Sequence, residues 1–497
     1  MTCTKRAPAE SPDLERIFHP KSLAIVGVSS NGMGFGAGIL GSLMAIGFEG
    51  TIYPVNPKGG EFLGLRIFRE VAEIPEAIDF AIISVPAKNV SAALDACRKK
   101  GAAGAEILSA GFSETATPEG IALEEEVLKV ARRGIRVIGP NCFGIYCPES
   151  GLTLLPGPDL SRESGNVAFL SQSGGMAIDF GQMGQWAGVR FSKVVSFGNG
   201  VDLRESELLD YLGSDPETGV IAMYVEGVEK GSNFFGILRE VAESKPVILY
   251  KGGLSDAGSK AVESHTASMG GSKRIWKSAI NQCNAVQVHS LEELAQASLG
   301  FSLLPPRPYE GISVVGGGGA LGVAACDAAE TYGLKLPVLK EEINDRIMSI
   351  LPKPGSSAFN PVDVANPLVP PQILQDTLSL VAEDDTIDVQ ILIQLLYHYK
   401  SLAMALGADS VRDVTPYREL ADSVEEVVEK TGKPVIIVLP NTKRGLQSMD
   451  VEEMMRDARD IFLKKKMPVF DDLSDALRAI HHVSKYYAIK QRRWKEL

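Results

Sequence analysis

Short apolar runs rich in Val, Ile and Ala alternate with stretches of helical periodicity from Ser22 onward. Runs of this kind, bounded by glycine, are typical of strands buried on both faces, and their alternation with helices is typical of β-α units in a parallel sheet. The chain is therefore predicted to be an α/β protein built from doubly wound parallel sheets. Its 497 residues lead us to expect about three domains.

Three series of predicted strands define these domains. The first includes strands near 23–28, 51–55, 80–85, 104–108 and 136–138, and the proline-rich segment 305–308 separates the second series from the third. The predicted boundaries are 13–150, 158–303 and 309–480, followed by a carboxyl-terminal tail at 481–497.

The second and third series look like copies of one unit. Each opens with a strand that runs into a Gly/Ser loop, at 171–175 and at 316–319, and each later reaches a Lys-Pro-Val-Ile strand, at Lys245 and at Lys433. Only the second series follows that strand with a histidine segment, so a duplication with chemistry kept in one copy is predicted.

Charge, apolar run length and cysteine spacing argue against several classes of protein. A net charge of −12 argues against nucleic-acid binding, which needs a basic face. The apolar runs are too short to span a membrane, and no signal peptide is indicated. The six cysteines are scattered without paired spacing, so we expect reduced thiols, no metal site and a cytoplasmic location.

Two Gly/Ser-rich turns are candidate anion cradles. The first strand leads into a turn at 27–34, and the second strand is followed by Lys58 where an NAD-binding chain would have an acidic residue. A lysine there favours coenzyme A or NADP over NAD; the alternative is a solvated surface charge. The other cradle, at 171–175, opens a helix, but close packing alone could also require its small residues.

One histidine, His265, lies in a segment predicted to be a flexible Gly/Ser-rich loop at 251–271. An imidazole on such a loop is either a nucleophile toward a phosphoryl group or a passive surface side chain. A nucleophilic imidazole needs an acceptor for its second nitrogen. Glu226 ends a strand of the same predicted sheet, so the two could form a pair, or Glu226 could be a surface carboxylate.

Several motifs in a fixed order make the chain resemble the NDP-forming acyl-CoA synthetases, the superfamily of ADP-forming acetyl-CoA synthetase and succinyl-CoA synthetase. The resemblance extends from Leu14 to about Leu477. The motifs are PKSLAIVG at 20–27, YPVNPK at 53–58, SAGF at 109–112, GPNC at 139–142, SQSG at 171–174, SFGN at 196–199, YVEG at 224–227, SHT at 264–266 and NPVD at 360–363.

The resemblance implies a Rossmann-like CoA-binding domain followed by two flavodoxin-like domains. It implies that His265 is phosphorylated during turnover and that Glu226 orients and stabilises the phosphohistidine. Residues expected to contact coenzyme A are Ser29, Ser30, Asn31, Gly34, Lys58, Val85, Pro86 and Asn141. Residues expected to bind phosphate or an acyl phosphate are Ser171, Gln172, Ser173, Gly174 and Asn199.

Members that complete the reaction also carry an ATP-grasp domain, for which the residues after the third series leave too little sequence. We therefore expect an α subunit whose separate ATP-grasp β subunit binds ATP or ADP with Mg²⁺, and whose substrates are a carboxylic acid and its acyl-CoA. Two alternatives stay open: a CoA or acyl-CoA sensor without turnover, and an NADP-dependent dehydrogenase. No motif specifies the acyl group.

Overall fold

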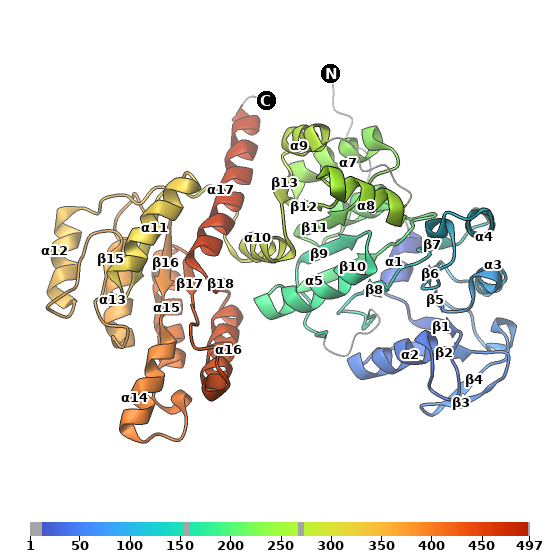
Figure 1. The fold of residues 1–497 in the computed structure, drawn as a ribbon, viewed down its shortest axis with the longest axis horizontal. Coiled ribbons are helices and arrows are strands. Elements are labelled where there is room, and N and C mark those ends of the chain that lie inside the picture. Colours follow the sequence, from blue (N-terminus) through green and yellow to red (C-terminus); the bar gives the residue numbers. More distant parts are fainter. Residues whose placement is uncertain (1–11, 154–159, 267–272, 496–497) are drawn as a thin grey trace. The chain divides into compact units, whose positions relative to one another are not determined.

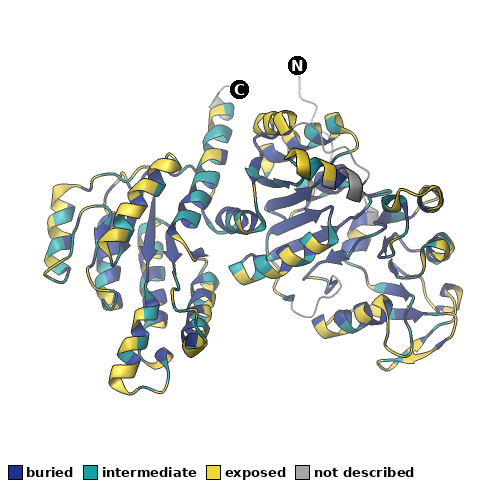
Figure 2. Ribbon diagram, viewed as in Figure 1, coloured by how far each residue is buried: buried dark blue, intermediate teal, exposed yellow. Residues whose placement is uncertain are grey.

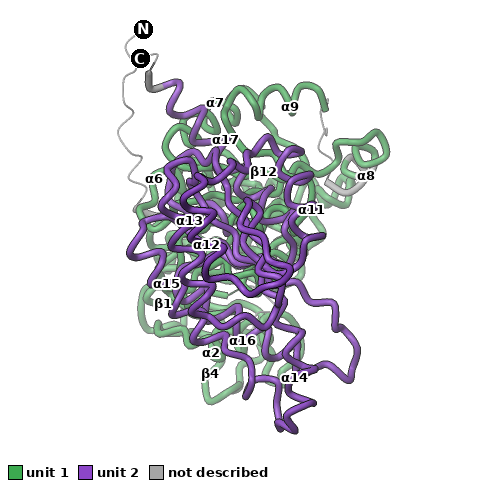
Figure 3. Tube along the Cα trace, turned by 90° about the vertical axis from the view of Figure 1, so that its left-hand side faces the viewer, with its two compact units in different colours: residues 1–298 green, residues 299–497 purple. Residues whose placement is uncertain are grey.

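The structure, a computed structural model, describes residues 12–153, 160–266 and 273–495 (Figure 1). It contains three sheets of five or six strands, and these central strands are buried while the helices around them keep an exposed face (Figure 2). The chain divides into two compact units, residues 1–298 and 299–497 (Figure 3). Among the described residues, no helix combines the length and the apolar character needed to cross a membrane.

The first sheet has the strand order β2-β1-β5-β6-β7, with every pair parallel. Its strands are β1 (Ser22–Val26), β2 (Thr51–Val55), β5 (Phe80–Ile83), β6 (Gly104–Ile107) and β7 (Arg136–Ile138). The order reverses between β1 and β5, and the carboxyl ends of strands at such a reversal are where open α/β sheets bind ligands. A hairpin of β3 (Gly60–Phe62) and β4 (Leu65–Ile67) follows β2.

The second sheet has the order β13-β12-β11-β9-β10-β8. Its strands are β8 (Gly144–Tyr146), β9 (Val167–Ser171), β10 (Phe191–Ser196), β11 (Val220–Val225), β12 (Val247–Lys251) and β13 (Val286–Val288). All pairs are parallel except β8 with β10, so a strand that precedes residue 150 completes the edge of this sheet. The order reverses between β9 and β11.

The third sheet, in the second unit, is parallel throughout and has the order β15-β14-β16-β17-β18. Its strands are β14 (Ile312–Gly316), β15 (Val362–Asp363), β16 (Val389–Ile393), β17 (Val435–Val438) and β18 (Val469–Phe470). Its parallel strands, taken along the chain, have the same spatial order as those of the second sheet. The α/β fold with doubly wound sheets is therefore confirmed. The strands β8 and β15 were not among those predicted from the sequence.

The α-helices cover both faces of the sheets, as right-handed crossovers on either side of a reversal require. In the first unit they are α1 (Pro12–Phe18), α2 (Phe35–Ile46), α3 (Val90–Lys99), α4 (Pro118–Ala131), α5 (Gly174–Ala187), α6 (Glu205–Ser214), α7 (Gly231–Ser244), α8 (Asp256–Thr266) and α9 (Lys273–Gln282). Helix α10 (Leu291–Leu303) contains the boundary between the units. The second unit has α11 (Gly319–Thr331), α12 (Glu341–Ile350), α13 (Pro371–Ala382), α14 (Tyr399–Leu406), α15 (Tyr417–Thr431), α16 (Met449–Lys464) and α17 (Leu473–Lys495).

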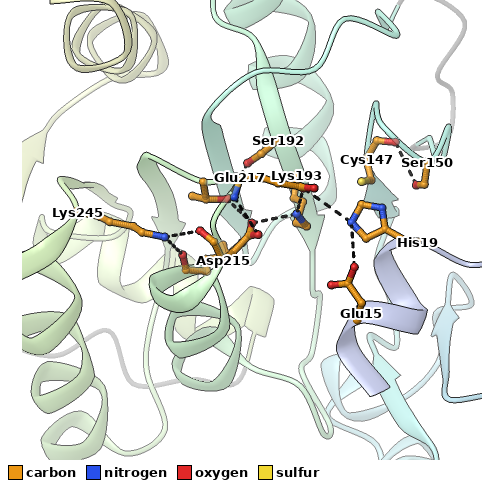
Figure 4. A network of polar contacts seen from close by, with 11 residues as sticks. Glu15, His19, Cys147, Ser150, Ser192, Lys193, Asp215, Glu217 and Lys245 are labelled. Atoms are coloured by element: carbon orange, nitrogen blue, oxygen red, sulfur yellow. Dashed lines mark hydrogen bonds and ion pairs between the residues drawn. The ribbon is translucent and has the colours of Figure 1, made fainter. Parts of the chain in front are cut away.

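A buried ionic network joins α1 to the second sheet at the amino-terminal side of its strands (Figure 4). Lys193 on β10 donates to Asp215 Oδ2 at 2.9 Å and to Glu217 Oε2 at 2.5 Å. His19 Nε2 of α1 lies 3.8 Å from Glu217 Oε2. Burial lowers the pKa of Lys193, but its hydrogen bonds to Glu217 and Asp215 outweigh burial and raise the pKa overall. The ammonium therefore stays charged inside the protein.

The replacement Lys193→Met is expected to destabilise the first unit by about 3 kcal/mol, because Asp215 would be left as an unpaired buried charge. Calorimetry should show a lower melting temperature for this variant. Lys99→Met is the control, since the Lys99 side chain is 69% exposed in its ion pair with Asp95 and should leave the transition in place. Equal melting temperatures for Lys193→Met and the wild type would contradict the structural role of the network.

Candidate active site

A cavity of about 770 Å³ lies in the first unit, where the carboxyl ends of the first two sheets converge. One continuous apolar cluster packs the two sheets together and includes Leu23 and Ile25 from β1 with Leu170 and Val195 from β9 and β10. Six of the predicted site residues line the cavity: Asn141, Gln172, Ser173, Gly174, Asn199 and Glu226.

The first turn of α5 forms one wall of the cavity. Ser171 is fully buried and does not line the cavity, and its hydroxyl donates to the carbonyl oxygen of Ser173 at 2.6 Å, which holds the turn. Ser173 caps the helix by accepting from the backbone N–H of Met176 at 3.4 Å. A Cβ on Gly174 would lie 2.2 Å from the Phe143 ring, whereas Gly175 faces open space. Backbone N–H groups and the positive end of the helix dipole thus border the cavity, a typical anion site.

Glu226 follows β11, beside the reversal in strand order, and its side chain is buried at 8% exposure. Tyr224 Oη donates to Glu226 Oε1 at 3.1 Å. Gln172 Oε1 accepts from the backbone N–H groups of Glu226 at 2.8 Å and of Gly227 at 3.2 Å. Glu226 Oε2 is buried and has no hydrogen-bond partner among the described residues. The carboxylate is thus held in place with one oxygen unsatisfied.

The protonation of Tyr224 supports this arrangement. Burial, followed by the neighbouring Glu226 carboxylate, raises the pKa of the Tyr224 phenol. The phenol therefore keeps its proton at neutral pH and remains a donor to Glu226. The Gln172 amide oxygen is used by the backbone of the Glu226 segment, whereas the expected contact with phosphate would use its amide N–H groups and stays a prediction.

Lys251, the last residue of β12, lies beside this segment and was missed by the sequence analysis. Its ammonium is buried, with the residue 2% exposed, and donates to the carbonyl oxygen of Glu226 at 2.7 Å and to that of Gly252. Burial lowers the pKa of Lys251 to about 8, and the Glu226 charge opposes part of that shift. Lys251 lies beside the Glu226 segment because it pairs with Val225 in the sheet, and no local sequence motif predicts that pairing.

His265 lies in the last turn of α8, not in a loop. The expectation of a loop across 251–271 was wrong for this part because a helix starts there: Ser255 Oγ accepts from the N–H of Gly258 at 3.0 Å, and Val262 is buried. The His265 side chain and residues 267–272 lie outside the described structure. The predicted pairing of His265 with Glu226 therefore remains a prediction.

Asn199 is committed to protein partners. Its Nδ2 donates to Glu114 Oε2 at 2.6 Å and to Glu124 Oε2 at 2.8 Å, and its Oδ1 accepts from Asn141 Nδ2 at 3.4 Å. Burial raises the pKa of Glu114, but hydrogen bonds from Asn199 and from backbone N–H groups outweigh it, so the pKa is lowered overall. Glu114 and Glu124, which no sequence pattern singled out, tie the first domain to the Asn199 turn.

The predicted CoA contacts cluster at the reversal between β1 and β5. Gly27 follows β1 with φ +118°, and a Cβ there would lie 2.2 Å from the Ser84 carbonyl oxygen, so only glycine lets the segment after β5 approach this closely. In the turn that follows, Asn31 Oδ1 accepts from Ser29 Oγ at 2.6 Å. Phe35, next along the chain after this turn, is 63% exposed and lines the cavity.

The other predicted CoA contacts lie near this turn but do not line the cavity. Ser30, Gly34 and Lys58 are exposed. Val85 and Pro86 lie in the turn after β5, where the Val85 carbonyl oxygen accepts from Ser109 Oγ. An exposed aromatic ring, an exposed lysine and a glycine-rich turn at a helix start fit a ligand that combines apolar and phosphate groups.

Comparison with known proteins identifies two domains in the first unit. The family described as CoA binding domain matches residues 21–148, and the family described as succinyl-CoA ligase like flavodoxin domain matches residues 164–300. These matches favour CoA over NADP at the first turn. The fold and these matches define the class: a chain that joins a CoA-binding domain to a succinyl-CoA ligase-like flavodoxin domain.

Two curated relatives and one solved structure are similar over large parts of the chain. Acetate–CoA ligase [ADP-forming] I subunit alpha of Pyrococcus furiosus is 31% identical over 481 residues, which is 95% of this chain and 97% of that protein. Acetate–CoA ligase [ADP-forming] I of Archaeoglobus fulgidus is 38% identical over 377 residues. The structure of a dinucleotide forming acetyl-coenzyme A synthetase 1 from Ca. Korarchaeum cryptofilum, in complex with phosphate and ADP, has a TM-score of 0.81 and 29% identity, covering 97% of this chain and 99% of that one.

The chain belongs to the ADP-forming acetate–CoA ligase family, a branch of the NDP-forming acyl-CoA synthetases, and the resemblance drawn from its motifs is confirmed. The match to the Archaeoglobus fulgidus relative covers 76% of this chain. It covers 54% of that protein, so this chain spans about half of its length.

Proposed function

We propose that the chain is the CoA-binding, phosphohistidine-bearing subunit of an ADP-forming acid–CoA ligase. In this reaction phosphate attacks an acyl-CoA to give an acyl phosphate and free CoA. A neutral imidazole nitrogen of His265 then attacks the phosphorus, the bond from phosphorus to the acyl oxygen breaks, and the carboxylic acid leaves. The phosphoryl group passes from His265 to ADP, and every step is reversible.

The single observation that carries the proposal is the buried Glu226 Oε2, which has no hydrogen-bond partner among the described residues and lies beside the cavity that the first turn of α5 borders. A buried carboxylate oxygen without a donor is costly. An imidazole N–H would satisfy it, fix the tautomer and leave the other ring nitrogen free to attack. The α5 amino terminus, with the Ser173 and Gly174 backbone, would hold the phosphoryl group.

Coenzyme A would lie across the turn at 29–34, with Lys58 near its ribose phosphate and Val85, Pro86 and Asn141 along its length. The exposed Phe35 ring would be covered by the apolar part of the pantetheine arm. Coenzyme A supplies the thiol that becomes the thioester. The role of the protein is to orient that thiol toward the cavity bordered by α5.

A partner subunit completes the proposed enzyme. The Pyrococcus furiosus relative, whose match covers 95% of this chain and 97% of that protein, is named as an alpha subunit. We propose an ATP-grasp β subunit that binds ATP or ADP with Mg²⁺ and collects the phosphoryl group from His265. The acyl substrate is a carboxylic acid.

The test is a coupled assay with a purified ATP-grasp subunit, ATP, Mg²⁺, CoA and a panel of short, branched, aromatic and dicarboxylic acids. The expected result is acyl-CoA formation matched mole for mole by ADP, with base-stable, acid-labile phosphate on this chain. Calorimetric binding of CoA without turnover beside any β subunit would instead identify a sensor or scaffold. The sequence relationship to named ligases favours the enzyme.

A further inference from the structure

Lys251 is a buried cation that donates hydrogen bonds to two backbone carbonyl oxygens and lies beside an aromatic ring. Two donors point at the carbonyl oxygens of Glu226 and Gly252. The ammonium also lies 5.0 Å from the centre of the Trp276 ring on α9, within range of a cation–π interaction. A lysine with its donors used in this way is poorly placed to bind substrate, so its function must be exerted through the groups that it holds.

The two carbonyl groups belong to the two chain segments that the proposed chemistry must bring together. Glu226 leaves β11, and Gly252 leaves β12 on the path that continues through Ser255 into α8, the helix that carries His265. The two strands are parallel neighbours, with Val225 opposite Lys251. The Lys251 ammonium thus links the residue that follows β11, Glu226, to the residue that follows β12, Gly252.

Electrostatics add a second reason for a lysine at this position. Glu226 is 8% exposed, and its Oε2 has no hydrogen-bond partner among the described residues. An ionised carboxylate in such surroundings is stabilised by a nearby positive charge, and the Glu226 charge does act on Lys251. Removing the charge would leave both the carboxylate and two carbonyl oxygens less well satisfied.

We infer that Lys251 is a positioning residue for phosphoryl transfer, which ties the Glu226 segment to the root of α8 and so sets the encounter between Glu226 and His265. The inference rests on the proposed function. It assigns no contact with substrate to Lys251. A misplacement of either segment would slow the phosphoryl steps while the CoA turn on the first sheet stays intact.

The experiment compares the wild type with Lys251→Met, which keeps the length of the side chain but removes the charge and the donors. Assays use the full chain with its ATP-grasp partner. We expect kcat to fall about 10- to 100-fold, as misplacement of reacting groups does, while the KM for CoA and the calorimetric affinity for CoA stay near wild-type values. The phosphorylated form of the variant should also lose its phosphate faster than that of the wild type.

Lys251→Gln is the second variant, because its amide keeps a donor for one carbonyl oxygen but has no charge. If Lys251→Met does not fold, the same measurements are made on Lys251→Gln. A folded variant with wild-type kcat, or one whose kcat and CoA affinity fall together, would overturn the inference. Absence of phosphate uptake by the wild type would instead refute the proposed function. The two failures are therefore distinguishable.

Discussion

Replacing His265 by asparagine is expected to abolish uptake of acid-labile phosphate and to reduce turnover by a factor of at least about 10³, because the nucleophile itself is removed. Asparagine has a polar side chain of similar reach but no nitrogen that can accept a phosphoryl group. The measurement is incorporation of labelled phosphate from ATP in the presence of the partner subunit, followed by treatment with acid and with base. CoA binding to the first domain should be unchanged.

His289→Asn is the matched control. His289 follows β13 in the same unit, and the proposed chemistry does not use it. This control should take up phosphate like the wild type. Acid-labile phosphate on His265→Asn at the wild-type level would place the phosphorylated residue elsewhere and refute the central assignment.

Glu226→Gln is the second change with a large expected effect. We expect kcat to fall about 10²- to 10⁴-fold, as it does when other histidine-dependent enzymes lose the carboxylate that orients the imidazole. The amide has nearly the shape of the carboxylate, so Tyr224 keeps an acceptor. The second position, however, becomes an N–H donor that would face the imidazole N–H instead of accepting it. Steady-state assays should show a much smaller change in the KM for CoA.

A charge-matched control for this variant is Glu243→Gln, since Glu243 is exposed on α7. It removes the same charge from the same unit and should leave turnover at the wild-type level. Should Glu226→Gln also turn over at the wild-type rate, the unpartnered Oε2 would have no role in the reaction and the geometric argument for the site would fail.

Local patterns predicted much of the fold and part of the site. The run Ser22–Val26 is a buried strand, and Gly27 follows it where only glycine allows the close approach of Ser84. Glu226 was recognised because a polar residue after a buried strand belongs to the carboxyl edge of a parallel sheet, where ligands bind. Each of these inferences needs only a few consecutive residues.

Other features depended on contacts between distant segments. In the sequence, Lys251 lies only at the end of a predicted strand. Its pairing with Val225 in the sheet places the ammonium within hydrogen-bond distance of the Glu226 carbonyl oxygen. Asn199 was expected to bind phosphate, yet Glu114 and Glu124 from another domain occupy its amide. His265 was expected in a loop because glycines and serines surround it, but the cap at Ser255 starts a helix.

The sequence by itself determined the β-α alternation, the glycine-rich turns and the family, because periodicity, backbone conformation and motif order are local properties of the chain. Only the tertiary structure decided which polar groups are satisfied. Burial and hydrogen bonding depend on side chains far apart in sequence that meet at the carboxyl edges of two sheets. That packing alone distinguishes Glu226, whose Oε2 has no hydrogen-bond partner among the described residues, from Lys251, whose ammonium donates to two carbonyl oxygens.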